Sequence, residues 1–301
     1  MEPRVLSIQS HVVFGYVGNK SAVFPLQTLG FDVDAINSVQ FSNHTGYPNG
    51  FKGEVMDGDK LLTIVEGLES NGLLNNKHTH LLTGYIGSAS FLSAVLQIIN
   101  KLKTSSPDFK YVCDPVLGDN GKLYVPEELV EIYKKDVLKL AYMVTPNSFE
   151  CEKLTGITIT DMASATTACE ALHALGPTVV VITSMHFEDE DGKLTIMVSD
   201  KSLPETARWA VTFDRIEGHY TGTGDLTAAL LLAWDHNTSD ESPQFPKWKV
   251  VLEKVANTMK KVIKKTFETN PGGELRLVQS RKDIEGGGGW ESGAINARPI
   301  T

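Results

Sequence analysis

The chain has 301 residues, of which 41% are hydrophobic and 22% are charged, proportions typical of a globular protein rather than a mainly disordered chain. Acidic residues outnumber basic ones by 37 to 28, which gives a formal net charge of −9. That sign disfavours a surface for nucleic acid or for an anionic membrane.

The cysteines and the apolar segments exclude several further classes. Cys113, Cys151 and Cys169 are odd in number, widely spaced and free of any C-x-x-C pattern, so a disulfide framework or a zinc site is not expected. No basic segment followed by a long apolar segment stands at the start, and the longest apolar run, 228–234, is far shorter than a membrane span of about 18 residues. We therefore expect a protein of the reducing cytosol.

In chain order, short apolar runs alternate with stretches of helical spacing. The runs predict buried strands at 5–8, 81–83, 111–113, 143–145 and 179–183. The stretches between them predict helices at 18–29, 59–68, 88–102, 126–133 and 161–175. This alternation indicates parallel βαβ units with a sheet covered on both faces.

The pattern changes after residue 184. Alternating residues predict antiparallel strands at 194–198 and 207–212 and a last edge strand at 275–278, while helical spacing predicts helices at 223–234 and 247–267. The fold class is therefore a three-layer α/β/α domain with a central, mostly parallel sheet and antiparallel edge strands. We expect one domain over 1–285 and a glycine-rich tail over 286–301 that is flexible or loosely docked.

The sequence Gly222-Thr223-Gly224-Asp225 precedes an apolar helix. The glycines allow close approach of the backbone to a ligand, and the first N–H groups of a helix point outward beside the positive end of its dipole, so the segment suits phosphate. The alternative is that Asp225 only caps the helix. The segment is neither a Walker A loop nor the glycine fingerprint of a dinucleotide site.

Two acidic segments also follow predicted strands. In Cys113-Asp114-Pro115-Val116-Leu117-Gly118-Asp119, two carboxylates on one loop suit Mg²⁺ held through water, or they form a plain turn. In Thr145-Pro146-Asn147-Ser148-Phe149-Glu150, Asn147 and Glu150 fit a reciprocal helix cap, or Glu150 joins the acids near a metal.

Polar and aromatic residues gather in two further segments, 7–19 and 38–47, which suit an aromatic ring with polar edges. Each segment alone is more typical of a polar loop than of a binding site. Together with the acids and the glycines they lie at the carboxyl ends of successive parallel strands, where one cleft is expected. Such a cleft suits transfer of a phosphoryl group from a nucleotide to an alcohol.

As a set, these segments resemble the pyridoxal kinases of the ribokinase-like superfamily. The resemblance runs from about 4 to 184 and from 214 to 284, in the order of the family's motifs. It departs from the family pattern at 185–209, beside the adenine side of the site, in the short loop 119–122 and in the glycine tail, which leaves nucleotide preference and lid behaviour open. The segments that carry it are 4–11, 15–19, 37–47, 82–85, 111–119, 123–127, 145–147 and 222–225.

The resemblance implies ATP-dependent phosphorylation of the 5′-hydroxymethyl group of pyridoxal, pyridoxine and pyridoxamine. It makes Asp225 the general base and gives the anion hole to Gly222, Thr223 and Gly224. At the helix N-terminus the dipole should keep Asp225 ionised and only weakly basic. The residues implied to contact the vitamin ring are Ser10, Val17, Thr45 and Tyr85, together with Asp225.

The resemblance also implies sites for the nucleotide and its cations, with Mg²⁺ accompanying ATP and a monovalent cation, usually K⁺, beside Asp114 and Thr145. A homodimer is implied in the same way. The nucleotide residues are Asp114, Asn147, Glu150, Thr183, Ser184, Thr223 and Gly224, and the metal residues are Asp114, Asp119, Thr145 and Glu150.

Three alternatives stay open. A hydroxymethylpyrimidine kinase shares the fold and takes a related ring, although Ser10-His11 and the segment 43–47 favour vitamin B6. A sugar kinase of the superfamily would carry a β-sheet lid after the first strand, where only 31–42 is available. A catalytically inactive B6-binding or carrier protein is disfavoured by the intact 222–225 segment and the acids.

Overall fold

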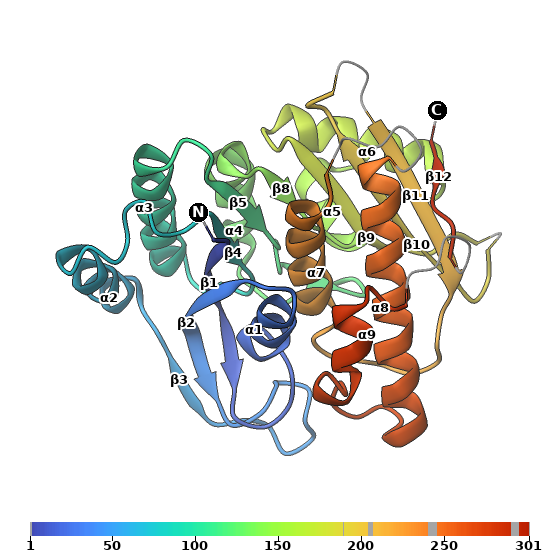
Figure 1. Cartoon of the computed structure of the whole chain (residues 1–301), viewed down its shortest axis with the longest axis horizontal. Coiled ribbons are helices and arrows are strands. Elements are labelled where there is room, and N and C mark those ends of the chain that lie inside the picture. The colour runs from blue at the N-terminus through green and yellow to red at the C-terminus, as the bar shows by residue number, and fades with distance from the viewer. Residues whose placement is uncertain (1, 189, 204–206, 240–245, 290–294, 301) are drawn as a thin grey trace.

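A single large sheet forms the middle layer of the molecule (Figure 1). The computed structural model describes residues 2–188, 190–203, 207–239, 246–289 and 295–300. Over these residues the strand order is β12-β11-β10-β9-β8-β5-β4-β1-β2-β3. The strands are β1 (Arg4–Val12), β2 (Asp32–Phe41), β3 (Gly53–Val55), β4 (His80–Thr83), β5 (Lys110–Cys113), β8 (Met143–Val144), β9 (Val179–Met185), β10 (Lys193–Asp200), β11 (Ala207–Asp214) and β12 (Arg298–Pro299).

The pairing between neighbouring strands is parallel from β2 to β9 and antiparallel at both edges. This confirms the predicted fold class. Because the six central strands run the same way, their carboxyl ends meet at one edge of the sheet, where α/β proteins place their ligands. A separate two-stranded hairpin, β6 (Gly118–Asp119) and β7 (Lys122–Leu123), lies after β5.

Helices cover the two faces of the sheet (Figure 1). One hydrophobic core joins the sheet to α2 (Gly58–Ser70), α3 (Ala89–Ser105), α4 (Glu127–Ile132), α5 (Ser148–Thr155) and α6 (Met162–Ala174). The other core joins it to α1 (Asn19–Thr28), α7 (Thr223–Asn237), α8 (Lys247–Thr269) and α9 (Arg281–Glu285). Within the described part of the chain, no helix has the length and apolar character needed to cross a membrane.

Strand β1 shows why the predicted central strands do not have one face exposed to solvent. Val5 packs into the core with α7 and α8, whereas Leu6 and Ile8 pack into the opposite core, and all three are completely buried. A strand covered on both faces needs apolar side chains at successive positions rather than at alternating ones. The same requirement accounts for the other predicted central strands, which the structure confirms.

Side-chain caps mark the starts of α3 and α6. The hydroxyl of Ser88 accepts a hydrogen bond from the N–H of Phe91 at the start of α3. The carboxylate of Asp161 accepts one from the N–H of Ser164 at the start of α6. Each cap satisfies a backbone donor that has no partner within the helix, and so fixes where the helix begins.

The C-terminal part of the chain differs from its prediction at 275–278. Residues 275–278 form no edge strand: Leu275 and Leu277 are completely buried from a loop, and a 3₁₀ turn at Val278–Ser280 follows. The sheet edge is instead β12, in the segment expected to be a loose tail. Its Arg298 and Pro299 pair with β11, although residues 290–294 and 301 of that segment lie outside the described residues. The division into one domain ending at 285 stays a prediction.

Apolar side chains in this part of the chain are buried without forming the predicted strand. Leu275 and Leu277 fill the core beneath α8 without pairing, because the N–H of Arg276 donates to the hydroxyl of Thr266 instead of a strand. Ile295 and Ala297 are 7% and 6% exposed, so the tail buries apolar surface that composition alone does not reveal.

Candidate active site

The glycine-rich turn before α7 is pressed against the loop that follows β1. Gly222 has a φ of 84° and precedes the first turn of α7. A Cβ at Gly222 would lie 2.0 Å from the carbonyl oxygen of Tyr16, so only glycine permits this contact. The N–H groups of Thr223 and Gly224 open the helix, at the end where backbone donors have no partner within the helix. The turn is therefore a cradle of backbone donors whose geometry suits an anion.

Asp225 sits in the first turn of α7 but does not cap it. Its Oδ2 accepts a hydrogen bond of 2.8 Å from the N–H of Gly18, which comes from the opposite end of the chain. Burial raises the pKa of the Asp225 carboxyl above its ordinary value, and the hydrogen bond from Gly18 offsets part of that rise. The carboxylate is therefore a stronger base than the helix dipole alone would leave it.

A second group of acids gathers where β5 and β8 end. The hydroxyl of Thr145 donates to Oδ1 of Asp114 over 3.2 Å, and both side chains are buried. Glu150 is also buried, and its negative charge and that of Asp225 raise the pKa of Asp114 further than burial alone. The structure thus brings together the predicted base, the predicted metal residues and the end of the central strands.

Glu150 holds the loop after β5 in place. Its Oε1 accepts hydrogen bonds from the N–H groups of Leu117 at 3.0 Å and Gly118 at 3.4 Å, and its Oε2 accepts one of 2.9 Å from the N–H of Asn147. The side chain of Asn147 caps α5 in return by accepting from the N–H of Glu150. The predicted reciprocal cap is confirmed, and the same carboxylate also fixes the segment that bears Asp119.

The hairpin of β6 and β7 carries Asp119 close to these acids. The Asp119 carboxylate accepts from the backbone and the side-chain amide of Asn120 and raises the pKa of Glu150 through its charge. No ion pair neutralises Asp114, Glu150 or Asp225 among the described residues. Nor do those residues hold three or more His, Cys, Asp or Glu side chains grouped to bind a metal alone. Uncompensated carboxylates beside Thr145 fit a hard cation that also takes ligands from phosphate and water.

The predicted ring-binding residues lie at the ends of three neighbouring strands. Ser10 is on β1 and Val17 is buried in the loop that follows. Thr45 is exposed in the loop between β2 and β3, and the half-buried Tyr85 follows β4. These strands are adjacent in the sheet, so the residues share one end of it, but no hydrogen bond among the described residues joins Thr45 or Tyr85 to Asp225.

The predicted nucleotide residues Thr183 and Ser184 complete the end of β9. The N–H of Thr183 donates to the carbonyl of Pro146 over 2.9 Å, and the carbonyl of Ser184 accepts from the Ser148 hydroxyl at 2.8 Å. These contacts pin the start of α5 to β9. They place both residues beside the segment that carries Asn147.

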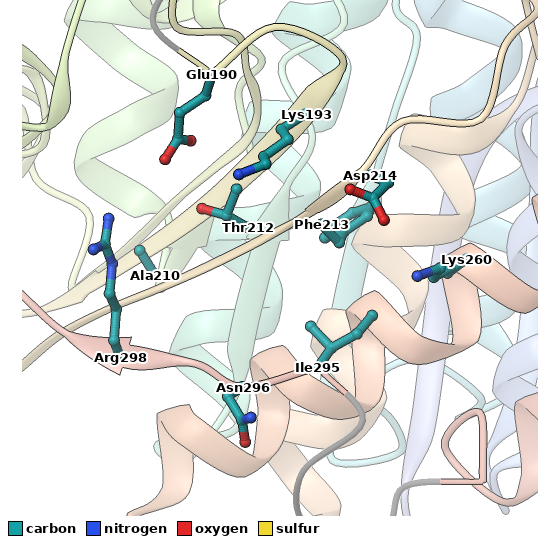
Figure 2. A pocket seen from close by; sticks show the side chains of 10 residues that line it. All are labelled: Glu190, Lys193, Ala210, Thr212, Phe213, Asp214, Lys260, Ile295, Asn296 and Arg298. Atoms are coloured by element: carbon teal, nitrogen blue, oxygen red, sulfur yellow. The ribbon is translucent and has the colours of Figure 1, made fainter.

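A cavity of about 420 Å³ lies beyond this row of residues, at the outer edge of the sheet (Figure 2). Lys193 of β10, Thr212 of β11, Lys260 of α8 and Arg298 of β12 are among the side chains that line it. None of the predicted site residues does so. Part of its lining comes from 185–209, the segment that departs from the resemblance described above.

Sequence reasoning missed the contacts that connect these segments. Gly18 and Leu117 act through their backbone N–H groups, which any residue type offers, so no side-chain pattern points to them. Glu274 accepts a hydrogen bond from the N–H of Tyr16, 258 positions away. No local spacing could signal a contact over that distance.

Replacing Asp114 by Asn should stabilise the protein in buffer without metal ions, more at pH 8 than at pH 5. Burial and the neighbouring acids raise the pKa of Asp114 in the folded state, so the folded chain keeps a proton there that the unfolded chain has lost. Stability therefore falls as pH rises from the ordinary pKa of an aspartic acid through the raised one. Asn still accepts the hydrogen bond from the Thr145 hydroxyl, and because an amide does not titrate, the variant does not lose stability at this position as pH rises.

Calorimetric melting of both proteins at the two pH values measures the effect. A gain of 1 kcal/mol raises the melting temperature by about 2–4 °C. Comparison with wild type cancels the titration of the buried histidines, which is common to both proteins. An Asp114→Asn protein that melts below wild type at pH 8 would contradict the repulsion among these acids.

Comparisons with known proteins give a consistent result. A family model described as phosphomethylpyrimidine kinase matches residues 75–240. A pyridoxal kinase of Arabidopsis thaliana is 50% identical over 295 residues, which cover 93% of this chain and 91% of the relative. A pyridoxal kinase of Homo sapiens is 43% identical over 307 residues, which cover 94% of this chain and 96% of the relative.

Solved structures agree with the curated relatives. The structure of pyridoxal kinase from Leishmania donovani in complex with ADP and pyridoxamine has a TM-score of 0.88 and 38% sequence identity, and the match covers 99% of each chain. A second structure of that protein, in complex with ADP and pyridoxine, has a TM-score of 0.88 and 37% identity over 99% of each chain.

Proposed function

The chain belongs to the pyridoxal kinase family, and from that premise we propose that Asp225 is the general base for transfer of the ATP γ-phosphoryl group to the 5′-hydroxymethyl group of vitamin B6. One observation supports this most. Asp225 directly follows the backbone cradle formed by 222–224 in the first turn of α7, and the N–H of Gly18 holds its carboxylate in place.

The proton of the alcohol passes to Asp225 while the phosphoryl group arrives. An alcohol has a far higher pKa than a carboxylic acid, so full deprotonation before transfer would be costly. In a loose transition state the hydroxyl sheds its proton late, and a carboxylate with a raised pKa is well suited to accept it.

In this proposal the cradle formed by Gly222, Thr223 and Gly224 binds the phosphoryl group during its transfer. Their N–H groups lie at the positive end of α7 and are free of partners within the helix. Donors fixed in advance stabilise the charge on the equatorial oxygens without reorganisation. The position of Gly222 against Tyr16 keeps this donor set rigid.

The acids beside β5 and β8 hold the nucleotide and its cations in this proposal. Asp114 and Thr145 would hold a monovalent cation, K⁺, while Asp119 and Glu150 would orient Mg²⁺ through water. The cations would neutralise charge on the ATP phosphates. Asn147, Thr183 and Ser184 lie along the same edge and would contact the nucleotide, with Glu150 fixing the loop between them.

Ser10, Val17, Thr45 and Tyr85 would hold the vitamin ring at the ends of β1, β2 and β4. Tyr85 offers a half-buried ring for stacking, and Thr45 offers a hydroxyl in the exposed loop after β2. The primary alcohol of the vitamin would then face Asp225. We also propose a homodimer in the cytosol, and the buried, unpaired Cys113, Cys151 and Cys169 are consistent with a reducing compartment.

Release of ADP with pyridoxal, pyridoxine and hydroxymethylpyrimidine, with and without K⁺, tests the proposal. We expect turnover with both B6 compounds, slower turnover with hydroxymethylpyrimidine, and a loss of rate when K⁺ is withdrawn.

Two results would overturn this assignment. Faster turnover of hydroxymethylpyrimidine would favour the kinase whose family model matches residues 75–240. Binding of pyridoxal by titration calorimetry, without turnover at any concentration of ATP and Mg²⁺, would show an inactive B6-binding protein.

A further inference from the structure

One carboxylate joins the two loops on the vitamin side of the site. Glu274 lies in the loop after α8, and its side chain is 12% exposed. Its Oε2 accepts a hydrogen bond of 2.8 Å from the N–H of Tyr16, and its Oε1 accepts one of 2.9 Å from the hydroxyl of Tyr47. Two segments that follow β1 and β2 are thus tied to a third segment from the C-terminal part of the chain.

His44 adds a third contact to the same carboxylate. The N–H of Gly46 donates to Nδ1 of His44 over 3.1 Å, which leaves Nε2 as the protonated nitrogen of the neutral ring. Nε2 faces Oε1 of Glu274 at 3.4 Å, and the rings of His44 and Tyr47 pack with centroids 4.6 Å apart. The loop that carries Thr45 is therefore fastened to Glu274 on both sides of Thr45.

The segment that Glu274 binds at Tyr16 is also connected to Asp225, by two backbone contacts. The carbonyl of Tyr16 abuts Gly222, and the N–H of Gly18, two residues further on, donates to Asp225. The loop passes close to the glutamate as well. A Cβ at Gly15 would lie 2.3 Å from the Glu274 carboxyl group, so the carboxylate fits here only because residue 15 has no side chain.

We propose that Glu274 is a positioning residue that sets the loop bearing Thr45 and the loop bearing Gly18 relative to Asp225, and so governs capture of the B6 substrate. The proposal rests on the proposed function. Among the described residues, the hydrogen-bond and ion-pair partners of Glu274 belong to the loops after β1 and β2, and none of them lies at the ends of β5, β8 and β9, where the nucleotide residues are. Its loss should therefore affect the vitamin and not the nucleotide.

The isosteric change Glu274→Gln tests this. The three groups that face the carboxylate all donate to it. Gln keeps one oxygen that accepts, but its NH₂ group cannot accept, so the donors on one side of the carboxylate lose their acceptor. We expect the KM for pyridoxal to rise roughly tenfold, because the free energy of one hydrogen bond to a charged acceptor corresponds to about that factor in affinity. The value of kcat should fall less, and the KM for ATP should stay within a factor of two.

Tyr47→Phe and the double variant complete a cycle. Removing the Tyr47 hydroxyl should raise the KM for pyridoxal by itself, and the double variant should show less than the product of the two effects, because both changes break the same contact. Glu268→Gln, at an exposed acid near the end of α8, is the matched control and should behave as wild type.

The outcomes separate this proposal from the one on which it rests. If wild type fails to phosphorylate any B6 compound, the proposed function fails. If wild type turns over but Glu274→Gln changes neither KM, or lowers the melting temperature while both KM values move together, Glu274 is a structural residue and the positioning role is wrong.

Discussion

Replacing Asp225 by Asn should lower kcat by roughly 10²–10⁴-fold and leave the protein folded. Asn keeps an oxygen that can accept from the N–H of Gly18, so the contact between the two ends of the chain survives. It cannot take the proton of the alcohol. The cradle of N–H groups and the binding residues remain, so a residual rate above the uncatalysed one is expected.

Steady-state kinetics and a melting curve measure both parts of this expectation. Asp59→Asn is a matched control, because Asp59 is an exposed acid in the first turn of another helix, α2. That control should keep wild-type kcat. An Asp225→Asn enzyme within a factor of two of wild type would remove Asp225 from its role as base.

The fold was predictable because its signals are local. Strands such as 5–8 and 179–183 are covered on both faces, and their short, mostly apolar runs predict them. The reciprocal cap between Asn147 and Glu150 was equally visible, since both partners lie within one helical turn. Strand β2 was not identified, because only Ile36, Ser38 and Val39 of its ten residues are buried and they form no apolar run.

The connections within the site were not predictable. Asp225 and Gly18 meet over 207 positions, and the donor is a backbone N–H that carries no side-chain signature. The polar position of Glu274 between the apolar Leu275 and the glycines of 272–273 reads in sequence as a solvated turn. The sequence therefore indicates which groups perform the chemistry, whereas their relative placement depends on contacts between segments far apart.

The strand wrongly predicted at 275–278 shows that a local pattern does not determine whether a segment finds a pairing partner. Alternation of apolar and polar residues is a local signal, and Leu275 and Leu277 provide it. The pairing partner that would make it a strand is a tertiary property. Here β11 takes β12 as its partner, and the two leucines fill the core beneath α8 from a loop.

Replacing Gly222 by Ala should reduce kcat by roughly 10²–10³-fold, the loss seen when one donor of an anion hole is displaced. The added Cβ would lie 2.0 Å from the carbonyl oxygen of Tyr16 and 2.8 Å from Oγ of Ser21, so one of the two backbones must move. Moving Gly222 disorders the cradle. Moving Tyr16 displaces Gly18, and with it the hydrogen bond that orients Asp225.

Strain and clash can be separated with a second glycine. Gly30 has a φ of 93°, close to the 84° of Gly222, but a Cβ there would meet nothing within 4 Å. Gly30→Ala should therefore cost about 1 kcal/mol of stability from backbone strain and leave kcat unchanged. If Gly222→Ala loses only the same stability and keeps its kcat, the close approach of the two loops does not shape the cradle. If its kcat falls while its melting temperature matches that of Gly30→Ala, the loss comes from displaced donors, as the contact between Gly222 and Tyr16 requires.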